Sequence, residues 1–257
     1  MMNPIKALWA QNKAVLNGWL AVSNAFTAEI MAAQGYDALT IDLQHGLVDY
    51  QGAVSMLQAM RASGVSPMIR VPWLDPTHIM KSLDAGALGV ICPMINTRQQ
   101  AEELVSYCRY APTGVRSFGP IRASLSVGAG YFAEADTQII CLAMIETEQA
   151  LSNLDDILAT PGLDGIYIGP ADLAISLYGR RFPTGFDRTE PEMIETIRTI
   201  LAAAKKAGKR AGLHNGHADY AAKAAGWGFD LLTISSDARL LAAAAKTSVD
   251  LFRASID

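Results

Sequence analysis

The sequence has few cysteines, and their spacing fits no known cysteine motif. Its three cysteines, Cys92, Cys108 and Cys141, show no CxxC spacing, and two of them lie within apolar runs. This pattern argues against a disulfide framework and against a redox or zinc motif. We therefore expect buried thiols in a reduced, cytoplasmic compartment.

Excess positive charge and long apolar runs are also missing. The 21 lysines and arginines are outnumbered by 25 acidic residues, which gives a net charge of −4 and a pI near 5.6. Nucleic-acid binding needs a basic face, so this partner is not expected. No run reaches the roughly 18–20 apolar residues of a membrane helix. With 257 residues, 51% of them hydrophobic, the chain can bury a large core, and we interpret residues 1–257 as a single domain.

Short apolar runs alternate along the chain with longer stretches of helical period. The runs predict eight strands at Gly18–Val22, Ala38–Asp42, Pro67–Val71, Leu88–Cys92, Ile139–Ile145, Gly165–Ile168, Arg210–Leu213 and Leu231–Ile234. The stretches predict helices at Thr27–Gln34, Tyr50–Ser63, Pro76–Ala85, Thr97–Arg109, Glu148–Ala159, Pro191–Ala207, Ala218–Ala225 and Asp237–Arg253. Several of these end in a glycine, namely Gly35, Gly64, Gly86, Gly208 and Gly226. Eight such units predict a (β/α)8 TIM barrel.

A doubly wound open sheet is the alternative architecture. It rarely needs eight equal repeats, and no GxGxxG follows the first predicted strand, so its dinucleotide-binding version has no support. The longest stretch without periodicity is 110–137, between predicted strands four and five. In a barrel we expect this stretch to be a loop on or over the active face, with Arg116, Arg122 and Ser124 as polar candidates. A solvated loop without function is the other interpretation.

Polar side chains stand at the ends of four predicted strands. Asp42, Gln44 and His45 follow one run, Arg70 ends the next, and Glu146 and Asp172 end two more. Only the last two are expected as metal ligands: converging carboxylates suit Mg²⁺ or Mn²⁺ when water and substrate oxygens complete the coordination. Each also has a simpler interpretation, since Asp172 could cap a helix and Glu146 could be a first-turn residue stabilised by a helix dipole.

Proton transfer is expected at His45, because its unperturbed pKa lies near neutrality. Asp42 lies three residues before it, and Asp84 is a possible orienting carboxylate; a histidine in a loop can also be plain polar surface. Arg70 would meet an anion in a barrel mouth, or would form an ion pair with Asp42 or Glu146.

The predicted strands and their ends lack lysine, so Schiff-base chemistry is not expected. The segment His214-Asn215-Gly216-His217 follows predicted strand seven. It could bind an anion or a metal, although capping of the next helix is the simpler expectation.

Taken together, the sequence resembles the metal-dependent hydroxy-keto-acid aldolases of the HpcH/HpaI group over nearly its whole length. The specific segments are Ile145-Glu146-Thr147 and Gly169-Pro170-Ala171-Asp172-Leu173. Supporting segments are 42–45, 69–73 with 75–76, 84–87, 90–94, 109–116 and 236–237. The resemblance implies reversible aldol cleavage of a 4-hydroxy-2-oxo acid to pyruvate and an aldehyde.

The resemblance also implies the roles of individual residues. Glu146 and Asp172 would hold a divalent ion (Mg²⁺, Mn²⁺ or Co²⁺), and the backbone of Ala171 would contact the keto acid. His45 would be the general base, with Asp84 raising its basicity, while Arg70 would stabilise the enolate. Asp42 completes the catalytic set.

Around the keto acid we expect Arg70, Ala171, Asp172, Ser124 and Met144. Two positions depart from the family pattern: Met144 stands where glutamine is common, and Gln44 stands where glutamate is frequent. These changes affect substrate preference and metal affinity more than the reaction class.

Two other functions remain open from the sequence alone. One is a malyl-CoA or citramalyl-CoA type of lyase, although no basic run is present to receive CoA; the other is a non-catalytic protein that binds a keto acid. The small apolar residues at 240–245 suit an eighth outer helix. The family resemblance instead implies a C-terminal helix packed on a neighbouring subunit of a homotrimer or homohexamer.

Overall fold

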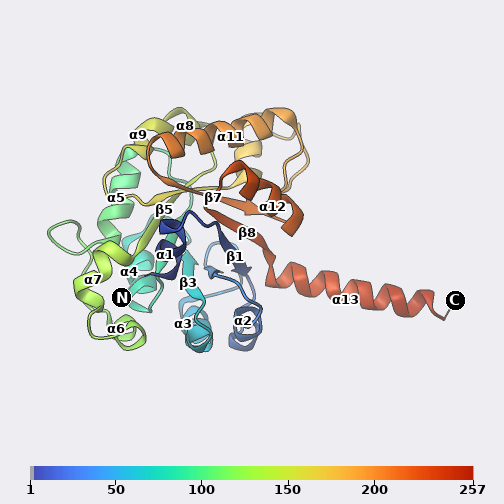
Figure 1. Cartoon of the computed structure of the whole chain (residues 1–257), viewed down its shortest axis with the longest axis horizontal. Coiled ribbons are helices and arrows are strands. Elements are labelled where there is room, and N and C mark those ends of the chain that lie inside the picture. Colours follow the sequence, from blue (N-terminus) through green and yellow to red (C-terminus); the bar gives the residue numbers. More distant parts are fainter. Residues whose placement is uncertain (1–2, 257) are drawn as a thin grey trace.

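The computed structural model describes residues 3–256, and its centre is a closed parallel barrel (Figure 1). The strands pair in chain order from β1 to β8, and β8 closes on β1. Their bounds are Val15–Leu20, Ala38–Asp42, Ser66–Arg70, Gly89–Cys92, Ile140–Ile145, Gly165–Ile168, Arg210–Asn215 and Leu231–Ser236. The predicted (β/α)8 barrel is therefore confirmed, with strand ends shifted by a few residues at most.

Most of the helices surround the barrel and pack on the outer faces of its strands, while α1 and α13 do not. The helices are α1 Pro4–Ala10, α2 Ala25–Ala32, α3 Tyr50–Ala59, α4 Pro76–Asp84, α5 Arg98–Cys108, α6 Ile121–Val127, α7 Tyr131–Gln138, α8 Glu148–Ser152, α9 Leu154–Leu158, α10 Pro170–Tyr178, α11 Pro191–Lys206, α12 Ala218–Trp227 and α13 Asp237–Ala254. Side-chain oxygens cap many of them; Thr97, for example, forms a capping box with Gln100 at the start of α5. No helix within residues 3–256 is both long and apolar enough to span a bilayer.

The differences from the predicted helices have local causes. The predicted helix at 148–159 is two short helices, because Asn153 ends α8 before Leu154 begins α9. The left-handed residue after α12 is Gly228, with φ of 105°, so the predicted cap at Gly226 is wrong. Helices α1, α6, α7 and α10 were not predicted, and each is nine residues or shorter.

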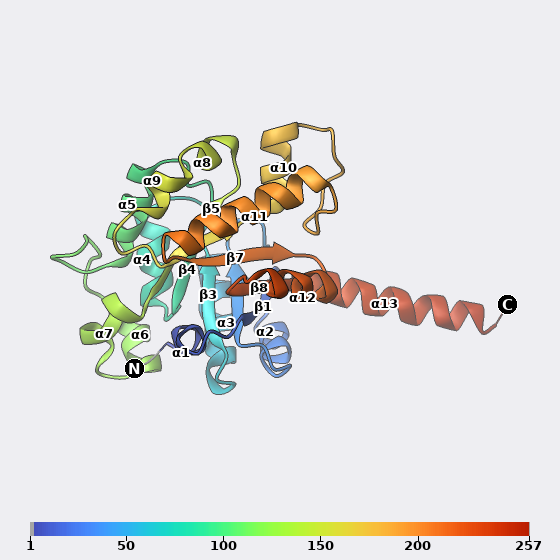
Figure 2. The same ribbon diagram turned by 45° about the horizontal axis from the view of Figure 1, so that its top comes forward.

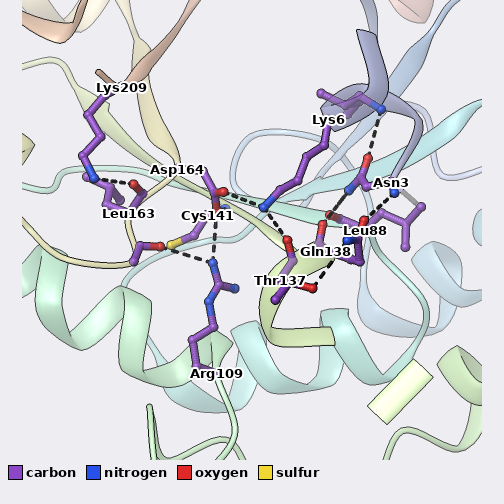
Figure 3. A network of polar contacts seen from close by, with 12 residues as sticks. Asn3, Lys6, Leu88, Arg109, Thr137, Gln138, Cys141, Leu163, Asp164 and Lys209 are labelled. Carbon is purple, nitrogen blue, oxygen red and sulfur yellow. Dashed lines mark hydrogen bonds and ion pairs between the residues drawn. The ribbon is translucent and has the colours of Figure 1, made fainter. Parts of the chain in front are cut away.

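The amino end of the barrel is closed by α1. Ile5 and Trp9 are buried against the residues that fill the barrel interior. Figure 3 shows the polar contacts that hold this end together, with Asp164 at their centre. Its carboxylate accepts hydrogen bonds from Lys6 Nζ at 2.7 Å, Arg109 Nη2 at 3.1 Å and the backbone N–H of Cys141 at 2.9 Å. Segments distant in sequence are thereby fixed at the end opposite the strand carboxyl termini.

The interior also contains a buried polar chain. Asn17 contacts the hydroxyls of Thr40 at 3.0 Å and Thr233 at 2.8 Å, and Thr233 contacts the hydroxyl of Tyr167 at 2.5 Å. Because each of these groups has a partner, the barrel can bury them without an unpaired polar atom. These hydrogen bonds connect β1 and β2 through β8 to β6.

The segment at 110–137 is not the loop over the active face that the sequence suggested. It follows α5 rather than β4, so it connects a helix to a strand and lies at the amino end of the barrel. It contains α6 and α7, and the α6 side chains Arg122 and Ser126 share a cavity with Gly86 and Leu88, just before β4. Arg116 is buried and forms an ion pair with Asp84 at 2.6 Å. The stretch therefore lies at the end of the barrel opposite the carboxyl ends of the strands.

The last helix leaves the barrel. In both views α13 projects away from the rest of the molecule (Figures 1 and 2), and within the described part of this helix only Asp237 is buried. A TIM barrel usually covers the outer face between β8 and β1 with its last helix. Here that face carries an apolar cavity of about 310 Å³, which we call the β8–β1 groove. It is lined by Ala14, Val15, Leu16, Ala218, Ala221, Ala222, Ala225, Leu232 and Ile234.

Candidate active site

A cavity of about 250 Å³ opens at the carboxyl ends of the strands. Six predicted site residues line it: Asp42, His45, Arg70, Met144, Ala171 and Asp172. Other lining residues include Trp19, Phe186, His214, Asn215, Ser235 and Arg239. In TIM barrels this end carries the active site. Three of the four strand tips chosen from sequence, Asp42, Arg70 and Asp172, therefore meet in one cavity.

Asp42 and Arg70 form the buried ion pair of this cavity. Asp42 Oδ1 accepts from Arg70 Nε at 2.8 Å, and Oδ2 accepts from Arg70 Nη2 at 2.5 Å. Asp42 also accepts from Trp19 Nε1 and from the backbone N–H groups of Gln44 and His45. Burial alone would raise the pKa of Asp42, but the hydrogen bonds and the charge of Arg70 outweigh it and lower the pKa.

The pairing of Arg70 with Asp42 was one of the two interpretations of that arginine, and it is the observed geometry. It does not remove Arg70 from the cavity, because the side chain still lines it. The guanidinium carbon lies 4.8 Å from the ring centre of Trp19. Because Asp42 accepts two hydrogen bonds from the guanidinium and the Trp19 ring packs against it, the guanidinium has little freedom to rotate. Asp42 therefore orients Arg70 in a fixed position.

Glu146 stands directly after β5 and is 3% exposed. Its Oε1 accepts the backbone N–H of Met94 at 2.7 Å. Burial, the main cause, and the charge of Asp172 raise the pKa of Glu146 to about 7, against the lowering effects of the Met94 N–H and Arg70. Met94 has a left-handed φ of 56°, unusual for a side chain of this size. That local strain aims its N–H at the carboxylate.

The surroundings of Glu146 fit a divalent cation. The charge of Asp172 raises the pKa of Glu146, and a cation bound by the two carboxylates would remove this repulsion. A Cβ at Gly169 would lie 2.5 Å from Glu146 Oε2, so glycine keeps this space open. No cluster of three or more His, Cys, Asp or Glu occurs among residues 3–256. Two protein carboxylates would thus leave most positions to water and substrate oxygens.

Helix α10 begins at this point. Gly169 occupies its N-cap position without a side-chain cap, and Ala171 and Asp172 lie in the first turn. The first N–H groups of a helix have no partner within the helix and favour anions. Asp172 makes no capping hydrogen bond, so the interpretation of Asp172 as a helix cap is wrong. Met144, 2% exposed, lies close to Gly169 and gives the floor an apolar surface.

His45 lies at the exposed rim of the cavity. Its backbone N–H is held by Asp42 at 3.2 Å, and its ring makes no hydrogen bond to any residue between 3 and 256. Gly46 packs so closely on Asp42 and Ala21 that a Cβ would meet the Asp42 carbonyl oxygen at 2.3 Å. The turn therefore fixes the backbone and leaves the imidazole free to reach a substrate.

Three predicted residues do not line this cavity, namely Glu146, Asp84 and Ser124. Asp84 ends α4, at the amino end of the barrel, where it is bonded to Arg116. Because α4 runs away from the active face, Asp84 does not reach His45 of the same chain, and its role as an orienting carboxylate stays a prediction. Ser124 lies in α6 at the same far end and does not line this cavity. Asp84 was assigned from its position and from the family resemblance, and Ser124 from its position in the 110–137 stretch; neither gives the direction of the helix.

The sequence reasoning missed the aromatic wall of the cavity. The His214 ring lies 4.7 Å from Trp19 and 4.4 Å from Phe186, centre to centre, and its Nδ1 is 3.1 Å from the hydroxyl of Tyr167. Burial, chiefly, lowers the pKa of His214 to about 3, and Arg70 adds to the effect. His217 instead points outward to Asp187 at 2.6 Å. The signal available in the sequence for this wall was that His214 directly follows the predicted strand Arg210–Leu213.

Comparison with known proteins agrees with this geometry. The model of the HpcH/HpaI aldolase/citrate lyase family matches residues 16–244. The chain belongs to this family. It is 42% identical to a hydroxypyruvate/pyruvate aldolase of Rhizorhabdus wittichii over 95% of this chain and 96% of that protein. It is 31% identical to a 5-keto-4-deoxy-D-glucarate aldolase of Escherichia coli O157:H7, over 98% and 97%.

Solved structures give the same picture. A HpcH/HpaI aldolase/citrate lyase family protein from Burkholderia cenocepacia matches with a TM-score of 0.89 and 29% identity, over 98% of this chain and 100% of that chain. A HpcH/HpaI aldolase from Desulfitobacterium hafniense matches with a TM-score of 0.86 and 26% identity, over 96% of both. The predicted family is confirmed, and this family member is an aldolase, a carbon–carbon lyase. The CoA-ester lyase and the non-catalytic binder are not favoured.

Proposed function

We propose that the enzyme cleaves a 4-hydroxy-2-oxo acid to pyruvate and an aldehyde, and catalyses the reverse addition, at the cavity between β2, β3, β5 and β6. The observation that carries the proposal is the Asp42–Arg70 pair, which aims a fixed positive charge into the cavity that Asp172 also lines. Fixed charge of this kind stabilises an enolate without reorganisation. The names of the aldolase relatives point to the same substrate class.

Each residue has a task that its position allows. The N–H groups at the start of α10, around Ala171, would receive the carboxylate of the keto acid. Arg70 would stabilise negative charge on the keto oxygen as the C3–C4 bond breaks. His45 would remove the proton from the C4 hydroxyl, and in the reverse direction a methyl proton of pyruvate. Met144 would pack against the methyl group.

Glu146 and Asp172 would hold a divalent cation, with Mg²⁺, Mn²⁺ and Co²⁺ as candidates. A bound cation supplies Lewis-acid polarisation of the keto acid. Asp172 lies in the first turn of α10, and the Met94 N–H donates to Glu146 Oε1, which supports this pair as the candidate ligands.

The test is pyruvate release from a 4-hydroxy-2-oxo acid, coupled to lactate dehydrogenase, with and without chelator. We expect chelation to abolish cleavage and added divalent ions to restore it. Glu146→Ala and Asp172→Ala should remain inactive in excess metal, whereas Asp155→Ala, on the exposed side of α9, should behave as wild type. Full activity in chelator would refute the metal-dependent mechanism.

We also propose that α13 packs in the β8–β1 groove of a second copy of the chain. The helix exposes Leu240, Leu241, Val249, Leu251 and Phe252, while the groove is lined mainly by alanines and aliphatic residues. Each copy therefore has one unpaired apolar helix and one uncovered apolar face of matching chemistry.

Oligomeric state by light scattering tests this packing. Leu241→Lys on the helix and Ala222→Trp in the groove should each dissociate the assembly, because one removes the apolar contact and the other fills the space. Ile30→Lys, on the exposed face of α2, is the matched control. An assembly unchanged by both test variants would place the interface elsewhere.

A further inference from the structure

Arg239 is a positively charged residue in the active-site cavity that the chemistry above does not use. It lies in the first turn of α13, just after β8, and its side chain lines the cavity. Its guanidinium carbon lies 5.5 Å from the ring centre of Phe186, which in turn packs on His214. Arg239 therefore comes from the β7–β8 side of the barrel, whereas the proposed catalytic groups come from β2, β3, β5 and β6.

The charge of Arg239 has no counter-ion among the residues that the structure describes. No ion pair within residues 3–256 includes it, in contrast to Arg70, whose charge is balanced by Asp42. The neighbouring carboxylate is Asp187, close to Gly216. Asp187 uses its two oxygens for the N–H of Gly216 at 2.7 Å and for His217 Nδ1 at 2.6 Å. A second guanidinium is thus available to an anion in the cavity.

His214 supplies a neutral polar group on the same wall. Its Nδ1 contacts the hydroxyl of Tyr167, and its Nε2 has no partner within the described residues. When Tyr167 donates to Nδ1, the proton of the neutral ring lies on Nε2, which becomes a donor. Arg239 and His214 together present donors and positive charge, with Phe186 between them.

We propose that Arg239 binds a carboxylate on the aldehyde half of the substrate, so that this enzyme prefers acceptor aldehydes that carry a carboxylate. The inference rests on the proposed aldol function, because it assigns the second substrate of that reaction. The keto acid uses Arg70 and the start of α10, which leaves the β7–β8 wall for the aldehyde. A guanidinium suits a carboxylate, since its planar donors match the two oxygens.

The experiment compares matched aldehydes in the addition to pyruvate. Succinic semialdehyde is paired with butanal, and glyoxylate with glycolaldehyde. We expect Arg239→Gln to lower kcat/KM for the two carboxylates by about 10-fold, the effect of one charged hydrogen bond at a partly exposed site. The neutral aldehydes should change less than about 2-fold. Arg253→Gln, which removes the same charge from the last turn of α13, should leave all four unchanged.

A second readout separates this inference from the function on which it rests. Exchange of the pyruvate methyl protons with deuterated water needs no aldehyde, so Arg239→Gln should exchange at the wild-type rate. Absence of exchange in the wild type would refute the proposed function itself. Slower exchange in Arg239→Gln alone would place Arg239 at the keto acid and overturn the inference.

Two further outcomes decide the chemistry of the acceptor. Equal losses for charged and neutral aldehydes in Arg239→Gln would show that Arg239 is structural. A preference of the wild type for glyceraldehyde 3-phosphate over glyceraldehyde, without one for succinic semialdehyde over butanal, would assign a phosphate instead. The carboxylate preference should weaken as salt is raised, because the guanidinium is exposed to solvent.

Discussion

Replacement of Asp42 by asparagine should damage both stability and catalysis. The change keeps the shape of the side chain and one acceptor oxygen, but it removes the charge opposite Arg70. Arg70 is only 8% exposed, so its charge would lie in the interior without a counter-ion. Breaking a buried pair in this way costs about 3–5 kcal/mol. Because the asparagine side chain could still accept from some of the present donors, we expect the lower end of this range, about 3 kcal/mol.

The loss can be measured in two assays. For a domain of this size, about 3 kcal/mol corresponds to a Tm lower by roughly 6–12 °C in calorimetry. In the steady-state assay kcat should fall about 10²–10³-fold, the usual cost of one misplaced oxyanion donor. Asp75→Asn is the matched control, because Asp75 caps α4 on the surface and asparagine caps a helix equally well.

The pH dependence of stability gives an independent check. The pKa of Asp42 is lowered in the folded protein, so its stabilising effect is complete above the unfolded value of 3.8 and is lost as the pH falls through the folded value. Wild type and Asp42→Asn should therefore converge in stability in strong acid. A Tm for Asp42→Asn within about 2 °C of wild type at pH 7, with kcat unchanged, would refute the assigned role of the pair.

Three other predictions concern the remaining site residues. Because the pKa of Glu146 is raised from 4.5 to about 7, the metal-free protein should lose about 3 kcal/mol as the pH rises through that interval, and Glu146→Gln should abolish the dependence in calorimetry. His45→Ala should reduce cleavage about 10²–10⁴-fold while Mn²⁺ affinity, measured by calorimetric titration, stays near wild type; loss of the ion would make His45 a ligand. Gly169→Ala should weaken Mn²⁺ binding at least about 10-fold, since the new Cβ would lie 2.5 Å from Glu146 Oε2 and displace it. Wild-type Mn²⁺ affinity in Gly169→Ala would show that Glu146 is not a ligand.

The sequence predicted the barrel and four of its polar strand tips because both depend on local pattern. Apolar runs determine the strands, and parallel strands in one barrel place their carboxyl ends together. Asp42, Arg70 and Asp172 thus reached the cavity as expected.

Helix direction and ring packing could not be obtained in the same way. Asp84 and Ser124 were placed near the site by their position in the chain, but each belongs to a helix and lies at the far end of the barrel. The aromatic wall of Trp19, Phe186 and His214 joins three separate segments, and no local pattern indicates which rings will meet.

The projecting α13 can make the stability of the folded protein depend on protein concentration. If the helix finds its packing surface on another molecule, folding and association are linked by mass action, and Tm rises with protein concentration. A stock solution and a strongly diluted kinetic assay would then contain different populations of assembled enzyme. Because α13 begins immediately beside the cavity, dilution would loosen the wall that carries Arg239 before it disturbs the Asp42–Arg70 pair. Acceptor preference and specific activity would therefore respond differently to dilution.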